Sequence, residues 1–97
     1  MQQSNLKAQW ETFCELPFPS ECAGEQIEGI DLVSLDTFAA GCVERCVDAP
    51  QRFDPDCNRI LTNSLYELEV VVANTEGEAF AYFEQLRTLI RSILEKH

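Results

Sequence analysis

Apolar side chains recur every three or four residues along four stretches of the chain, and segments rich in proline, glycine and polar residues separate these stretches. Such spacing places the apolar side chains on one face of an α-helix. We therefore predict helices over about 3–15, 35–48, 55–73 and 76–95. The β-branched run at 69–73 belongs to the third helical pattern, so we predict no strand.

The second predicted helix has the most regular stripe of apolar side chains. Its positions are Leu35, Phe38, Ala39, Cys42, Val43, Cys46 and Val47. Ser34 precedes this stripe and is a residue type preferred at the N-cap of a helix. We expect the whole stripe to pack in the core, including its two cysteines, because a buried cysteine behaves as a small apolar side chain.

A short polar break at 74–78 separates the third and fourth predicted helices. Asp54 and Pro55 suit the first positions of the third helix, and Thr75 with Glu78 has the spacing of a capping box for the fourth. A break this short predicts an antiparallel helical hairpin. The alternative is one continuous helix of about forty residues, because a lone glycine within a helix costs only about 1 kcal/mol.

The segment 16–33 is a long connection with two prolines, two glycines and no basic residue. Long ordered loops often carry function. Its acidic side chains are candidates for contact with a partner, and they are Glu21, Glu25, Glu28 and Asp31. The chain is thus predicted to be a single all-α domain over 1–97. Its fold is a compact four-helix bundle with a long antiparallel hairpin of helices three and four and a long ordered acidic loop between helices one and two.

The charge of the chain limits its partners. Seventeen acidic residues against seven basic ones give a formal net charge of −10 and a pI near 4.3. Nucleic acid and anionic membrane surfaces carry the same sign and are excluded as partners, whereas a basic protein is attracted. A chain of 97 residues has a thin core. We therefore also expect a homo-dimer or a place in a heteromeric complex.

The first fifteen residues are polar, and no stretch approaches the ~20 apolar residues of a membrane span. We therefore expect no signal peptide, no membrane contact and a cytoplasmic location. Five cysteines, an odd number, favour reduced thiols over a disulfide framework. Cys14, Cys22 and Cys57 keep a thiol redox or metal-responsive role open as an alternative.

The run Ser34-Leu35-Asp36-Thr37 resembles the helix start at the prosthetic-group serine of acyl carrier proteins. Those are small, acidic, four-helix proteins with a long loop before that serine. This chain departs from the family's pattern at Val33, where the family has Asp, and in its long third helix. The resemblance implies that Ser34 carries phosphopantetheine. It also implies that basic partner enzymes meet an acidic surface formed by Asp36, Glu44 and Asp48.

The sequence contains no nucleophile elbow, no phosphate-cradling glycine loop and no helical zinc motif. Its one histidine is His97, which lies outside the predicted helices, so we expect neither catalysis nor a bound metal or cofactor. We predict a non-enzymatic protein–protein interaction or regulatory module, with an acyl-carrier-like protein and a thiol protein as the alternatives. Aromatic candidates for anchoring a partner lie beside prolines or off the helical stripes, at Phe18, Phe53 and Tyr82.

Overall fold

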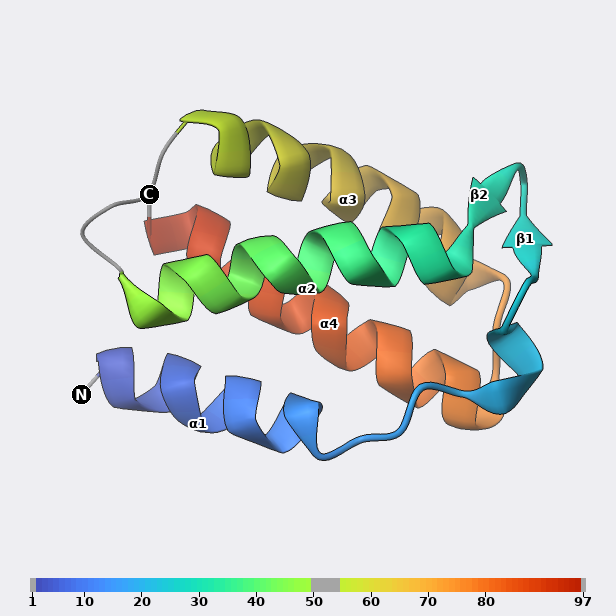
Figure 1. Ribbon diagram of the computed structural model, residues 1–97, viewed down its shortest axis with the longest axis horizontal. Coiled ribbons are helices and arrows are strands. Elements are labelled where there is room, and N and C mark those ends of the chain that lie inside the picture. The colour runs from blue at the N-terminus through green and yellow to red at the C-terminus, as the bar shows by residue number, and fades with distance from the viewer. Residues whose placement is uncertain (1, 50–54, 97) are drawn as a thin grey trace.

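Four helices run alternately in opposite directions, so that α1 begins and α4 ends at the same end of the bundle (Figure 1). They are α1 (Gln2–Cys14), α2 (Leu32–Asp48), α3 (Pro55–Ala73) and α4 (Gly77–Lys96). This computed structural model describes residues 2–49 and 55–96. The predicted all-α bundle of four helices is confirmed.

The antiparallel hairpin of α3 and α4 is confirmed, and these two helices share the most extensive contact in the molecule. Side chains of the break close the end of α3. Asn74 Nδ2 donates to the carbonyl oxygen of Val70 (2.8 Å), and Thr75 Oγ1 donates to that of Val71 (2.9 Å). Gly77 then begins α4 with a φ of 67°, a left-handed conformation that favours glycine. The alternative of one continuous helix is therefore wrong.

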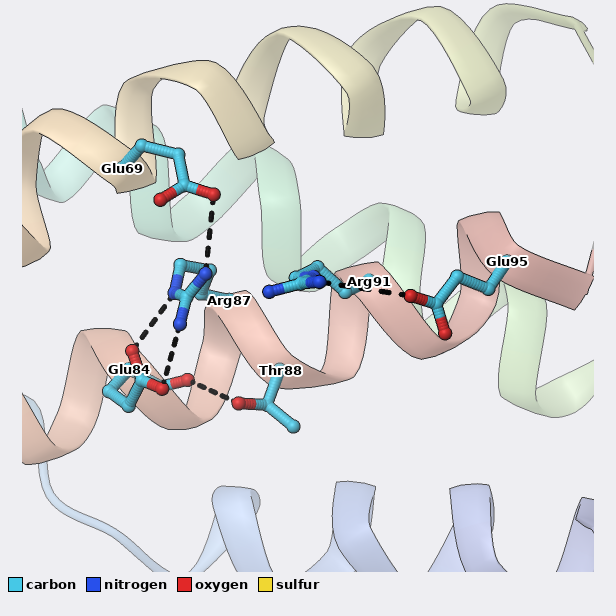
Figure 2. A network of polar contacts seen from close by, with 6 residues as sticks. All are labelled: Glu69, Glu84, Arg87, Thr88, Arg91 and Glu95. Atoms are coloured by element: carbon cyan, nitrogen blue, oxygen red, sulfur yellow. Dashed lines mark hydrogen bonds and ion pairs between the residues drawn. The ribbon is translucent and has the colours of Figure 1, made fainter.

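An ion-pair network also joins α3 to α4 (Figure 2). The Arg87 guanidinium binds both carboxylate oxygens of Glu84, at 2.9 and 3.0 Å, and reaches Glu69 on α3 at 3.2 Å. The Arg87 side chain is only 18% exposed. Its hydrogen bonds lower the pKa of the Glu84 carboxyl. The bidentate pair with Glu84 lies within α4 and orients the guanidinium, which then makes a single contact to α3 through Glu69.

The core is built around α4, which contacts each of the other three helices. Its most deeply buried side chains are Phe83, Leu86, Leu89, Ile90 and Ile93. A helix covered on several sides buries more than one stripe. Tyr82 lies off the main apolar stripe of α4 by its helical position. It is still only 7% exposed, because α4 is covered on several sides.

Phe38, which we expected in the core, lies at the surface instead, as does Phe80 on α4. Phe80 is 40% exposed and Phe38 is 64% exposed. Phe38 lies at the edge of the α2 stripe, whose buried centre runs through Leu35, Ala39 and Cys42. Helical spacing assigns such an edge position to the stripe, but burial depends on whether a neighbouring helix covers it.

The connection between α1 and α2 is ordered, as predicted, but it contains secondary structure that we did not predict. After the 3-10 turn η1 (Ser20–Cys22), β1 (Gln26–Ile27) pairs antiparallel with β2 (Ile30–Asp31). The turn residues Glu28 and Gly29 both have positive φ, at 52° and 82°. This is the arrangement of a type I′ hairpin turn. Strands of two residues are too short to produce an alternating pattern in the sequence.

The N-cap of α2 also differs from the prediction. Asp31, not Ser34, caps the helix, because its Oδ1 accepts from the backbone N–H groups of Val33 (3.0 Å) and Ser34 (3.2 Å). The hairpin leads directly into the helix, which begins at Leu32. Leu32 is buried, so the apolar stripe of α2 begins three residues earlier than the sequence pattern indicated.

Replacing the two residues by alanine separates the two cap assignments. We expect Asp31→Ala to lower the free energy of unfolding by about 1 kcal/mol, because two helix N–H groups lose their acceptor. Ser34→Ala is the matched control and should change stability by less than about 0.5 kcal/mol. Urea unfolding followed by circular dichroism measures both. A larger loss for Ser34→Ala than for Asp31→Ala would contradict the observed cap.

Candidate functional site

A surface groove lies where the hairpin, the first half of α2 and the middle of α3 meet. We call it the α2–α3 groove, and its volume is about 470 Å³. Its lining residues are Gly29, Ile30, Asp31, Ser34, Leu35, Phe38, Ile60, Asn63, Ser64 and Glu67. It brings together Asp31 and Ser34, two residues that the sequence singled out, with Phe38, which the sequence placed in the core.

The groove has a polar end and an apolar end, because α2 and α3 run antiparallel (Figure 1). Asp31 lies at the start of α2 and Glu67 lies in the second half of α3, so the two exposed carboxylates lie toward the hairpin. Phe38 and Ile60 lie toward the opposite end. Between the two ends lies Ser64, which is buried and lines the groove.

The charge of the groove is negative. Its lining contains the carboxylates of Asp31 and Glu67 and, among the residues that the structure describes, no Lys or Arg. Several arginines of the bundle bind its own acids elsewhere, including Arg59 with Asp56 at 3.0 Å and Arg87 with Glu84 and Glu69. The groove therefore combines an exposed aromatic side chain with two carboxylates, one of which, Asp31, also caps α2.

A second hollow lies beside the loop that follows α1. Its volume is about 340 Å³, and it is lined by Leu16, Pro17, Phe18, Pro19, Ser20, Glu78, Ala81 and Tyr82. The ring of Phe18 meets those of Tyr82 (5.5 Å) and Phe83 (6.1 Å) edge to face. Phe18 is half-buried in these contacts. The structure thus brings the sequence candidates Phe18 and Tyr82 together, in an aromatic cluster that holds the loop on α4.

Tyr82 also donates a hydrogen bond to Asp36 Oδ1 on α2, at 2.7 Å. Burial raises the pKa of the Asp36 carboxyl, and the hydrogen bond from Tyr82 opposes this rise. Burial and the neighbouring carboxylate together raise the pKa of Tyr82. The resemblance to acyl carrier proteins implied that Asp36 faces a partner, but this half-buried side chain joins α2 to α4 instead.

The other acidic candidates surround the hairpin. Glu21, Glu25 and Glu28 are exposed, and they do not line either of the two hollows described above. Glu28 occupies the hairpin turn. Phe53 lies outside the described residues. Glu44 and Asp48 are exposed on α2.

Cys14 and Cys22 are in surroundings that disfavour thiolate. Burial and the nearby Glu44 and Glu11 raise the pKa of Cys14, and burial with Glu21 and Glu25 raises that of Cys22. A raised pKa lowers the fraction of reactive thiolate at neutral pH. Cys57 is buried in the first turn of α3, where its Sγ accepts from Arg45 at 3.7 Å.

No family model matches the chain, and no curated protein or solved structure matches it either. None of the four helices, over the residues described, is both long and apolar enough to cross a membrane. Within 2–49 and 55–96, His, Cys, Asp and Glu side chains do not gather in any group of three that could hold a metal ion. The geometry and charge of the surface are therefore the observations that bear on function.

The hydrogen bond between Tyr82 and Asp36 gives a prediction with a defined pH dependence. Removing the hydroxyl with Tyr82→Phe leaves a half-buried carboxylate without this donor, and we expect a loss of about 1–2 kcal/mol in the free energy of unfolding near pH 7. The bond favours the ionised form of Asp36, so its contribution is present above the pKa of Asp36 and lost below it. The loss should therefore shrink as the pH falls from about 7 to about 3.

Thermal unfolding of wild type and variant across this pH range measures the difference. Tyr66→Phe is the matched control, because Tyr66 is the other tyrosine of the chain and is 71% exposed. It should leave stability nearly unchanged at every pH. A loss for Tyr82→Phe that stays constant with pH would show that the hydroxyl does not serve the Asp36 carboxylate.

Proposed function

We propose that the chain is a non-enzymatic protein-binding module that receives a basic partner in the α2–α3 groove. The observation that carries this proposal is the position of Phe38, a large apolar side chain that is 64% exposed beside a negatively charged hollow. Exposed aromatic side chains next to a pocket are typical anchors of protein interfaces.

The energetics favour a partner at this position. Full burial of a phenylalanine side chain stabilises a complex by about 1.5–3 kcal/mol, and Phe38 has more than half of that burial still to gain. The Asp31 and Glu67 carboxylates lie at the far end of the groove and supply charge that selects the partner. Attraction between an acidic groove and a basic surface raises the rate of association and rejects acidic proteins.

The net charge argues for a heteromeric complex over a homo-dimer at this groove. Two copies of a chain with charge −10 would place carboxylates of the same sign against each other. A partner with exposed lysine or arginine meets no such repulsion. The dimer that we expected from chain length would thus have to use another face.

The carrier alternative depends on Ser34, which is exposed on the first turn of α2 and lines the groove. Native mass spectrometry of the chain purified from its own source separates it from the binding proposal. A covalent increment localised to Ser34 would replace the binding module by a carrier. The thiol alternative is disfavoured by the raised pKa values of Cys14 and Cys22.

The binding proposal predicts that a partner is retained through Phe38. We expect the tagged chain, purified from its own source, to retain a protein in a fixed ratio, and Phe38→Ala to reduce that retention by about tenfold or more. Tyr66→Ala is the matched control, because Tyr66 is equally exposed but does not line the groove. It should retain the partner as the wild type does.

Stability measurements accompany this experiment, since both aromatic side chains are exposed and both variants should fold with stability within about 0.5 kcal/mol of wild type. The same retention by wild type and Phe38→Ala, or no retained protein at all, would reject the groove as the binding site.

A further inference from the structure

The shape of the α2–α3 groove restricts what can occupy it. Its lining extends from 31 to 38 on α2 and from 60 to 67 on α3, which is two helical turns on each, or about 10 Å. A valley between two antiparallel helices is the surface on which a third helix packs, through side-chain ridges that fit the groove. The strands of the hairpin have only two residues each, so an added strand would gain few backbone hydrogen bonds.

The distribution of chemistry along the groove restricts the occupant further. Phe38 and Ile60 form the apolar end, and Asp31 and Glu67 form the acidic end. A helix lying along the groove would present an apolar side chain to Phe38 and Ile60. About two turns away, the same helix would present a basic side chain to Asp31 and Glu67. Small residues at the centre, Ser34 and Ser64, leave room for a further apolar side chain between these two contacts.

We infer that the groove binds a short amphipathic helix of a partner protein, with an apolar residue packed on Phe38 and an arginine or lysine, about seven positions away, paired with Asp31 and Glu67. This inference rests on the proposed function and adds the chemistry of the partner to it. Arginine fits best, because its planar guanidinium can bind carboxylates through two hydrogen bonds at once. Charge complementarity excludes an acidic helix and a second copy of this groove.

The probe is a synthetic helical peptide of about 14 residues with leucines at i and i+4 and an arginine at i+7. A second peptide has glutamate in place of that arginine. Fluorescence anisotropy at physiological ionic strength measures the affinity of each peptide for the full chain. We expect saturable one-to-one binding of the arginine peptide, and binding at least about tenfold weaker for the glutamate peptide.

Variants of the chain identify the surface that binds. Phe38→Ala and Glu67→Lys should each lower the affinity for the arginine peptide by about tenfold. Glu67→Lys should also restore binding of the glutamate peptide. Glu44→Lys is the matched control, because it changes the net charge equally. Glu44 is exposed on α2 and does not line the groove. It faces Cys14, whose pKa it raises. Glu44→Lys should leave the affinity nearly unchanged.

Equal losses for Glu67→Lys and Glu44→Lys would overturn the inference, because the peptide would then respond to net charge alone. A dimer of the unliganded chain that dissociates in Phe38→Ala, seen by sedimentation, would overturn it in favour of a second copy. Retention of a native partner through Phe38 without peptide binding would reject only the amphipathic helix and leave the binding module standing. If no native partner is retained through Phe38 and the arginine peptide does not bind, both the amphipathic-helix inference and the binding-module proposal are rejected.

Discussion

The structure depends on the burial of α4 among the other three helices. A chain of this length can build one core, and here side chains of α1, α2 and α3 complete it around the buried residues of α4 from Phe83 to Ile93. The other helices each bury one stripe against it or against their neighbour. Such an arrangement makes α4 the element that tolerates change least, since a truncation at Leu86 or Ile90 opens a cavity in contact with several helices.

The same arrangement explains why α2 and α3 leave a groove. Both helices direct their stripes inward, so the side chains on their adjacent outer edges meet only each other. At this edge Ser34 and Ser64 line the groove, and Phe38 is left uncovered. Ser64 is a buried polar side chain on α3.

The sequence predicts the elements well, because helical spacing, proline and glycine act locally. The break at Gly77 is of this kind, and so is the stripe of α2, which was interpreted correctly except for its N-cap and for Phe38. The burial of Tyr82 and the exposure of Phe38 were not predictable in that way. Each depends on which neighbouring helix covers one side of its own helix, and periodicity contains no information about that side. The β-hairpin at 26–31 was not predicted for a different reason, because strands of two residues are too short to show an alternating apolar and polar pattern.

The candidate site was predicted only in part, and the missing part is an electrostatic property of the whole bundle. Asp31 was selected as one acid among several in a loop, whereas the structure uses it both to cap α2 and to line the groove. The negative charge of the groove follows from the placement of the few basic residues. Arg87 is committed to the contact of α3 with α4, and Arg59 is paired with Asp56 in its own helix. Because Arg59 and Arg87 bind acids of their own bundle, neither lines the groove, and among the described residues its lining contains the carboxylates of Asp31 and Glu67 but no Lys or Arg, which is the charge that the proposed basic partner requires.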